Sequence, residues 1–591
     1  MKKLQNKQPS HRAAGFSRRK IIVAACLFLA TGVGLFWAIH ILLTNNHNST
    51  TVSRKSAGQH GFDTSYETIS RRMDSYYENN NVYFSIADNS AVIDYAQTES
   101  SDSLNSVSKS TGSSAATDHS TTDTQVDGVM EGDIVNTDGN HIVTIQNSTT
   151  GFTASLYEVS GKKIEKKQVI PISNADYREM YLQDTTLVLI AQTWSQQERK
   201  TALYLYDISD LSNPVRLCEH TQDGEFQTSR LTDGYLYTFT HYTVEKQTFD
   251  KEKPETFVPR LDEKVMPADD ILLLTDQNDC RYQVMTSLSL SNYQEFTDET
   301  ASFGSPSNYY MSQENLYIVH EDRDSDWNSV KSDIGKYSYK NGLFTYIANT
   351  KIRGQIQNSY YMHEYKGNFV FVYTMDSYEG VSSNGLCVMD DKLNLIGELS
   401  RLGLDETIYA SYFLDNMAYF VTYRETDPVF AVDLADPKNP VLKSELKLPG
   451  FSSYLHSFGE NQLLGIGEGE ENNVKFSLFS TENPENLSEI SHLLMSPNTY
   501  SIAGSDHRVV FVDEARMLIG IGIDQYTSSH KKLKYEVYQW KNNRFQKVLS
   551  QKQSSPLSCL RGVRIGEYFY IVDVQEEQIQ VYDIKTWKIA K

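Results

Sequence analysis

Cysteine is scarce in this chain of 591 residues, which has only five. Cys26 lies in an apolar segment, and the other four stand alone at Cys218, Cys280, Cys387 and Cys559. No Cys-x-x-Cys pair or Cys/His spacing suited to zinc occurs, so the sequence argues against a zinc site. We expect the four to be small buried apolar residues.

The signatures of common catalytic classes are also missing. The sequence has no Gly-x-Ser-x-Gly elbow, no His-Glu-x-x-His and no phosphate-binding loop. It therefore predicts no catalytic residue.

Acidic residues outnumber basic ones outside the N-terminus. The net charge is −21, yet residues 1–43 hold seven basic residues and no acidic one, so the rest of the chain is more acidic still. An acidic body repels phosphates, which argues against nucleic acid as the partner.

Ile21 to Leu43 is a run of 23 residues without a charge, behind the basic segment 1–20. As a helix it spans about 34 Å, enough for the hydrocarbon layer of a bilayer. Because the basic flank is N-terminal, we expect a single-pass signal anchor in the cell membrane, with residues 1–20 in the cytoplasm and the C-terminal domain outside.

Three alternatives for this segment stay open. A cleaved signal peptide normally has a shorter apolar core and a site between small residues, which this segment lacks. Val23-Ala-Ala-Cys26 resembles a lipoprotein cleavage box, and Ser17-Arg-Arg-Lys-Ile-Ile22 resembles a twin-arginine export signal. The length and apolar character of the run favour the uncleaved anchor.

Residues 44–124 are predicted to form an extracellular stalk. A short helix is expected at about 63–78, and a disordered Ser/Thr-rich linker at about 97–124. The helix carries one apolar stripe, which favours a docking face on the following domain over a partner site. The stripe consists of Tyr66, Ile69, Met73 and Tyr77.

From residue 125 to 591 the chain repeats apolar strands separated by turn residues, at about 50 residues per unit. Such repetition predicts an all-β fold, a large β-propeller of eight to nine four-stranded blades. Long insertions at about 241–270 and 321–333 are expected as rim loops. The hairpins that define nine units centre on Asp138-Gly139, Gln183-Asp184, Asp233-Gly234, Gln313-Glu314, Lys366-Gly367, Asp415-Asn416, Gly459-Glu460, Asp513-Glu514 and Gly566-Glu567.

Two stretches resemble a known family. Gln125-Val-Asp-Gly-Val-Met-Glu-Gly-Asp-Ile-Val-Asn-Thr-Asp-Gly139 is one; the other is Asp427-Pro-Val-Phe-Ala-Val-Asp-Leu-Ala-Asp-Pro-Lys-Asn-Pro440, with Leu448-Pro-Gly-Phe-Ser-Ser-Tyr-Leu-His456 after it. They are similar to a bacterial family of secreted or membrane-anchored β-propeller domains, distantly related to WD40 repeats. The resemblance implies the propeller fold and a surface location, and no activity that could be carried over.

A calcium loop is the sharpest candidate for chemistry. Asp322, Asp324, Asp326 and Asp333 stand at positions 1, 3, 5 and 12 of a loop, the spacing of oxygen ligands for calcium. Trp327 occupies the position where such loops need glycine. An acidic hairpin tip in solvent is therefore the competing interpretation.

A polar ligand site is the second candidate. Arg424, Asp427 and His456 come from successive units and could line one end face. Asp433 instead ends a strand, where aspartate caps the following turn.

The predicted propeller and membrane anchor favour a non-enzymatic binding module at the cell surface, which would bind an envelope protein, a peptide or a glycan. The alternative is an extracytoplasmic hydrolase or lyase that uses carboxylates in the central funnel. Inward-facing acids, His and Arg at one mouth would favour the enzyme, and an aromatic patch would favour binding.

Overall fold

The structure is a computed structural model that describes residues 60–79, 118–194, 198–274, 278–323, 330–375, 381–424, 427–526 and 531–590. The predicted cytoplasmic tail and anchor (1–43) and most of the predicted linker lie outside the described residues. Within those ranges, no helix is both long and apolar enough to cross a bilayer.

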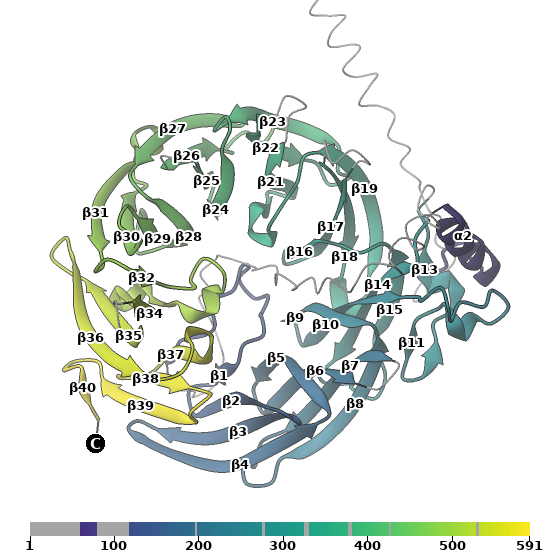
Figure 1. The fold of residues 1–591 in the computed structure, drawn as a ribbon, viewed down its shortest axis with the longest axis horizontal. Coiled ribbons are helices and arrows are strands. Elements are labelled where there is room, and N and C mark those ends of the chain that lie inside the picture. Colours follow the sequence, from purple (N-terminus) through teal and green to yellow (C-terminus); the bar gives the residue numbers. More distant parts are fainter. Residues whose placement is uncertain are drawn as a thin grey trace, which may run out of the picture. The chain divides into compact units, whose positions relative to one another are not determined.

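In the described residues nine sheets follow one another, and each is one blade of a β-propeller (Figure 1). Their main strands pair antiparallel, and the short strand β13 (Ile271–Leu272) joins blade 3 in parallel. Blades 1 to 3 are built from β1 (Val135–Thr137), β2 (His141–Ser148), β3 (Gly151–Ser160) and β4 (Lys163–Ser173); β5 (Ala175–Gln183), β6 (Thr186–Trp194), β7 (Arg199–Asp207) and β8 (Val215–Asp223); and β9 (Glu225–Thr232), β10 (Tyr235–Thr243), β14 (Arg281–Ser289) and β15 (Asp298–Phe303). Blades 4 to 6 are built from β16 (Asn308–Met311), β17 (Asn315–Arg323), β18 (Val330–Ser338) and β19 (Thr345–Arg353); β20 (Met362–Tyr365), β21 (Asn368–Met375), β22 (Ser383–Met389) and β23 (Leu395–Leu402); and β24 (Thr407–Leu414), β25 (Met417–Tyr423), β26 (Asp427–Asp433) and β27 (Val441–Leu448). Blades 7 to 9 are built from β28 (Phe451–Ser457), β29 (Gln462–Gly469), β30 (Asn473–Ser480) and β31 (Ser488–Leu494); β32 (Thr499–Tyr500), β33 (Phe511–Asp513), β34 (Leu518–Tyr526), β35 (Lys531–Trp540) and β36 (Phe545–Gln553); and β37 (Leu560–Ile565), β38 (Tyr568–Asp573), β39 (Gln578–Asp583) and β40 (Lys588–Ile589).

The propeller fold is confirmed, and the blade number is nine. Each predicted hairpin joins the innermost strand of a blade to the second strand. Asp233 and Gly234 show the local cause: both have positive φ (51° and 74°), as a tight two-residue turn between twisted strands requires. We call the face of the ring that carries these nine hairpins the hairpin face.

The core lies between neighbouring blades, because each sheet buries both faces against the next. Eleven of the twelve largest fully buried side chains are tyrosines, which accounts for the tyrosine-rich composition. Their hydroxyls reach polar partners across blades: Tyr237 donates to the Tyr339 carbonyl (2.8 Å) and Tyr570 to the Gly161 carbonyl (2.6 Å).

The ring closes between its first and last blades. Val135, Ile142 and Tyr157 of blade 1 pack with Tyr570 and Val572 of blade 9 in one buried cluster, and Figure 1 shows the two blades side by side. The two blades remain separate sheets rather than sharing one.

The insertion between β10 and β14 lies where the sequence predicts it. It adds β11 (Arg260–Leu261) and β12 (Lys264–Val265) to blade 2, and β13 (Ile271–Leu272) to blade 3. The second predicted rim loop, 321–333, is wrong in its extent, because β17 continues to Arg323 and β18 begins at Val330. Ladder pairing from Asn315–Ser338 to Arg323–Val330 extends this hairpin as regular sheet.

Helix α2 (Tyr66–Asn79) covers most of the range predicted for a helix. The Ser65 hydroxyl accepts the Thr68 amide (3.2 Å) and caps its start. Ile69, Met73 and Tyr77 are buried in one cluster with the insertion and blade 3, so the apolar stripe is a docking face.

Residues 118–133, which we call the strap, run across the inner ends of the blades before the chain enters β1. His119 forms a bridge with Ile565 of blade 9, and Met130 forms one with Leu231 of blade 3. Between these two bridges, the Gln125 side-chain amide donates a hydrogen bond to the carbonyl of Ser359 (2.8 Å). Ser359 lies just before blade 5. The strap therefore ties together blades that are far apart in the chain.

Candidate functional site

The strap carries acidic residues whose charges are met by basic residues of the ring. Glu131 lies 3.6 Å from the Arg230 guanidinium and 3.4 Å from the His507 ring. Burial disfavours the charged carboxylate, but Arg230 and His507 outweigh it and lower the pKa of Glu131 to about 2. The same carboxylate raises the pKa of His507 against the effect of burial.

A second acidic residue of the strap, Asp133, also faces an arginine, but here burial outweighs the nearby Arg561 and the pKa of Asp133 is raised. Arg561 Nε lies 2.9 and 3.1 Å from its two oxygens, and Arg561 reaches Asp506 at 3.2 Å. Asp506 also pairs with Arg508 (2.9 Å), which donates to the Gly132 carbonyl of the strap (3.1 Å).

These buried carboxylates are a structural assembly. Glu131, Asp133 and Arg561 are each at most 7% exposed, and the basic partners of the two carboxylates come from blades 3, 8 and 9. A substrate could reach them only if the strap left its place. Buried charges that pair in this way fix a chain segment in a unique position.

A pocket of about 520 Å³ opens beside the strap on the hairpin face. It lies between the inner strands β16, β20 and β24 of blades 4, 5 and 6, and strap residues 125–127 form its remaining wall. Its lining combines seven aromatic or apolar side chains with three carboxylates, and no lysine or arginine. These residues are Val126, Tyr310, Tyr360, Met362, His363, Tyr412 and Phe413, with Asp127, Glu314 and Glu364. We call this the hairpin-face pocket.

Glu364 is held in place by neutral donors. Its carboxylate accepts hydrogen bonds from the Ser312 hydroxyl (2.5 Å), the Asn315 side-chain amide (3.0 Å) and the Tyr317 hydroxyl (3.3 Å). Among the described residues, Glu364, Glu314 and Asp127 form no ion pair within 4 Å. Lys366, on the tip of the same hairpin as Glu364, extends to the Ala435 carbonyl (3.3 Å).

The aromatic wall of the pocket is rigid and uncharged. His363 stacks on Phe413 with ring centroids 4.9 Å apart and planes at 11°. Burial lowers the pKa of His363 to about 4, so the ring is neutral near pH 7. Tyr310 is 2% exposed, and its hydroxyl accepts a hydrogen bond from the Glu364 backbone amide (3.0 Å), which links the aromatic wall to the acidic side of the pocket.

The three residues proposed as a polar ligand site are not brought together, because His456 lies apart from Arg424 and Asp427. His456 is near the hairpin end of β28, where it is buried and lies 3.5 Å from Asp123 of the strap. Burial lowers the pKa of His456, but Asp123 outweighs it and the net shift is upward. Arg424 follows β25 at the opposite end of its blade, exposed and paired with Asp405, and Asp427 begins β26 beside it.

The turn role of Asp433 is confirmed. Its carboxylate accepts the Ala435 amide at 2.8 Å, and Asp207 accepts the Ser209 amide at the same distance in blade 2. Aspartates at this point of a blade close the turn after a strand.

The calcium prediction falls largely outside the described residues, which include neither Asp324 nor Asp326. Asp322 lies opposite Lys331 in the ladder and Asp333 opposite His320. The Asp333 carboxylate lies 3.4 Å from Lys351. In the described parts of the chain, no three His, Cys, Asp or Glu side chains are grouped as metal ligands would be. Calcium binding stays a prediction.

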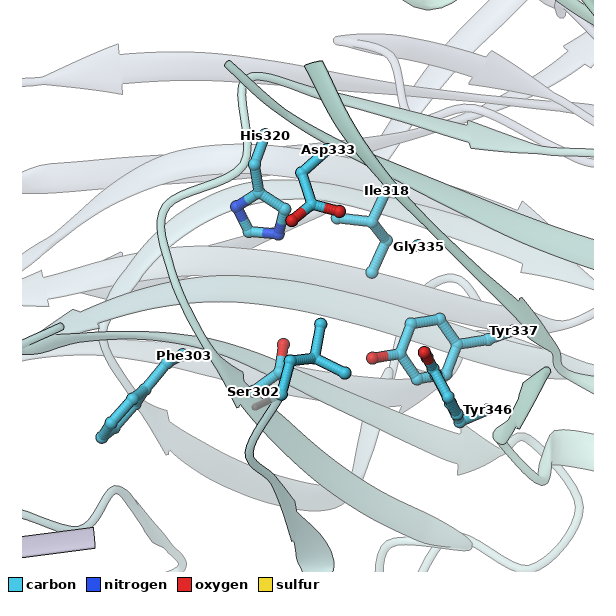
Figure 2. A pocket seen from close by; sticks show the side chains of 9 residues that line it. Ser302, Phe303, Ile318, His320, Asp333, Gly335, Tyr337 and Tyr346 are labelled. Carbon is cyan, nitrogen blue, oxygen red and sulfur yellow. The ribbon is translucent and has the colours of Figure 1, made fainter. Parts of the chain in front are cut away.

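A small cavity lies beside Asp333, between blades 3 and 4. Figure 2 shows the His320 ring and the Asp333 carboxylate together at one end of it, and Tyr337 and Tyr346 at the other. Its volume of about 20 Å³ has room for about one water molecule. The cavity is a packing gap rather than a ligand site.

The four described cysteines are free. Cys280 and Cys387 are buried, as expected, whereas Cys218 and Cys559 are half-buried.

Sequence reasoning did not find the hairpin-face pocket, although a signal was present. Glu314 belongs to one identified hairpin, and Glu364 lies two residues before another. Since inner hairpins of successive blades meet at the ring axis, acidic residues at equivalent points of adjacent units become neighbours. The ion pairs between the strap and arginines far away in the sequence, such as Asp133 with Arg561, could not be recognised from any local sequence pattern.

A protein-family model described as "Beta propeller domain" matches residues 119–587. The chain belongs to this beta propeller domain family. The chain is similar to an uncharacterised protein of Archaeoglobus fulgidus, 34% identical over 239 residues, which are 40% of this chain and 35% of the relative. The chain thus matches about a third of that protein's length. An uncharacterised protein of Methanocaldococcus jannaschii is 24% identical over 548 residues, 80% of this chain and 83% of the relative. Both organisms are archaea, so proteins similar to this beta propeller occur beyond bacteria.

Solved structures match this chain only at low similarity. An uncharacterised protein of Listeria monocytogenes has a TM-score of 0.35 and 9% identity, covering 73% of this chain and 97% of that one. Acylaminoacyl peptidase of Pyrococcus horikoshii has a TM-score of 0.30 and 8% identity, covering 69% and 58%. Likenesses of this size carry no argument about the activity of this beta propeller.

Proposed function

We propose that this protein is a binding module held at the outer surface of the cell membrane by residues 21–43, and that its ligand docks in the hairpin-face pocket. The observation that carries the proposal is the pocket itself, about 520 Å³ with a fixed aromatic wall and carboxylates that no basic side chain occupies. Pockets of about 300–1,000 Å³ with few polar groups are typical ligand sites.

The surface location is supported by the sequence. The uncharged run of 23 residues follows seven basic residues, and the domain behind it is acidic. The ligand would then be a component of the envelope: a protein, a peptide or a glycan. Nine rigid blades keep the pocket in one shape, which suits recognition without a moving part.

The alternative of a hydrolase or lyase has less support. The strap carboxylates Glu131 and Asp133 are buried in pairs with histidine and arginine. A general acid or base must instead come within hydrogen-bond reach of its substrate.

The test uses cells that make the full chain with a C-terminal affinity tag. We expect protease added to intact cells to remove the tag, and cross-linking to capture the same envelope component repeatedly. A matched variant, Phe413→Asp, should keep its surface location and lose that component. A tag protected in intact cells, or capture that Phe413→Asp leaves unchanged, would contradict the proposal.

A further inference from the structure

We infer that the hairpin-face pocket takes an organic cation, an ammonium or guanidinium group, either on a small amine or on a lysine or arginine side chain of a peptide. This inference rests on the proposed function and names the chemistry of its ligand.

Charge is the first argument. Asp127, Glu314 and Glu364 line the pocket, and His363, the residue there that could gain a positive charge, is neutral near pH 7. The remaining lining side chains are uncharged. The site is therefore net negative before a ligand arrives, in contrast to the strap, where each buried carboxylate already faces an arginine or histidine.

The hydrogen bonds of Glu364 are the second argument. Ser312, Asn315 and Tyr317 orient its carboxylate without neutralising it, since all three donors are uncharged. A carboxylate fixed in this way keeps a geometry that a charged donor can meet, and charge-assisted hydrogen bonds are about twice as strong as neutral ones.

The wall is the third argument. Tyr310, Tyr412 and Phe413 present aromatic surface next to the carboxylates. The faces of aromatic rings attract cations within about 6 Å of their centroids. Carboxylates and aromatic faces together favour an organic cation, whose alkyl part packs on the wall, over a fully hydrated metal ion.

The same features disfavour anions. A phosphate-bearing polymer or a uronic acid would meet three carboxylates in the pocket and a chain with a net charge of −21. An acidic protein instead raises the local concentration of cationic ligands.

The experiment is calorimetric titration of the purified full chain in detergent with three probes. N-acetyl-Gly-Lys-Gly-amide supplies a side-chain ammonium, butylammonium supplies a small alkyl ammonium, and N-acetyl-Gly-norleucine-Gly-amide, which carries no charge, is the counterpart of the first peptide. We expect at least one of the cationic probes to bind, and the norleucine peptide to bind at least about tenfold more weakly. Binding of butylammonium alone would assign small amines, and preference for the peptide would assign a side chain.

The variants locate the site. Glu364→Gln should weaken cation binding about tenfold. The Glu314 side chain is exposed, so we expect Glu314→Gln to leave the fold intact and to weaken cation binding about threefold. The matched control is Asp415→Asn, because Asp415 is an exposed residue on the neighbouring hairpin and lies outside the pocket. This substitution should leave the affinity for the cationic probes unchanged. Unchanged affinity in Glu364→Gln and Glu314→Gln would overturn the inference. If one of the two failed to fold, unchanged affinity in the other would do so.

Equal binding of the charged and norleucine peptides, or no binding of any probe at millimolar concentration, would also overturn it. The proposed function fails separately, through loss of surface location or of envelope capture. If Phe413→Asp abolishes capture while the cationic probes do not bind, the protein is a binding module whose ligand is not a cation.

Discussion

The strap and the hairpin-face pocket are neighbours, and both are acidic, but their carboxylates are in opposite situations. In the strap, Glu131 and Asp133 are buried and face arginine or histidine within 4 Å. In the pocket, Glu314 and Glu364 have no basic partner among the described residues, and the space in front of them is open. Paired and covered charges hold the ring together, whereas unpaired charges beside an aromatic wall are available to a ligand.

The largest effect is expected from breaking the strap's ion pairs. Arg561→Ala should lower the free energy of unfolding by about 3–5 kcal/mol, because Asp133 would stay buried without its guanidinium. Urea unfolding measures this loss. Arg424→Ala removes an exposed ion pair with Asp405 and should cost less than about 1 kcal/mol. Equal losses in the two variants would mean that the strap's charges do not hold the ring.

A cavity under helix α2 should have the next largest effect. Met73 is fully buried in the cluster between the helix and blade 3, so Met73→Ala is expected to cost about 2–4 kcal/mol. Arg71→Ala, on the exposed side of the same helix, should stay within about 0.5 kcal/mol. Thermal unfolding of both variants checks this, and a stable Met73→Ala would show that the helix does not contribute to the fold.

The two regions should respond to pH in opposite directions. The pKa of His507, beside Glu131, is raised, so its contribution to stability is present below pH 6.5 and is lost as the pH rises through its folded pKa. The pKa of His363 in the pocket is lowered to about 4, so stability is lost as the pH falls from 6.5 to 4, by about 1–3 kcal/mol.

Unfolding free energies measured from pH 4 to pH 9 test both. His507→Gln should flatten the alkaline side of the profile, and His363→Gln the acid side. If both substitutions flattened the same side, the assignment of a paired and an unpaired region would be wrong.

The smallest effect is expected from calcium. The β17–β18 hairpin is regular sheet up to Arg323 and from Val330, and Asp333 already lies near Lys351. We expect millimolar calcium or a chelator to shift the melting temperature by less than about 1 °C. If calcium raised the melting temperature by several degrees and Asp324→Ala abolished the rise, a calcium site would be established. The hairpin would then be a second place, besides the pocket, where acidic residues are available to a ligand.

The fold was predictable because its strongest signals are local. Asp233-Gly234 specifies a tight hairpin from two residues, and nine such hairpins define nine blades. The stripe of Ile69 and Met73 likewise predicts a docked helix from its spacing alone.

The site was not predictable to the same degree, because it depends on closure of the ring. Asp133 and Arg561 are 428 residues apart and meet only when blade 9 lies beside blade 1. The length of a hairpin is also hard to predict from local composition. Residues 321–323 and 330–333 have a loop-like composition, yet they pair with each other as strands in blade 4. Arg424 and His456, though near in sequence, lie at opposite ends of their strands.

The most direct test of this division is the free energy of unfolding of Asp133→Asn and Glu314→Gln, measured beside the unmodified chain in one denaturant series. Asp133→Asn should lose about 3–5 kcal/mol, and Glu314→Gln should stay within about 0.5 kcal/mol. A stable Asp133→Asn, or an equal loss in Glu314→Gln, would contradict the account.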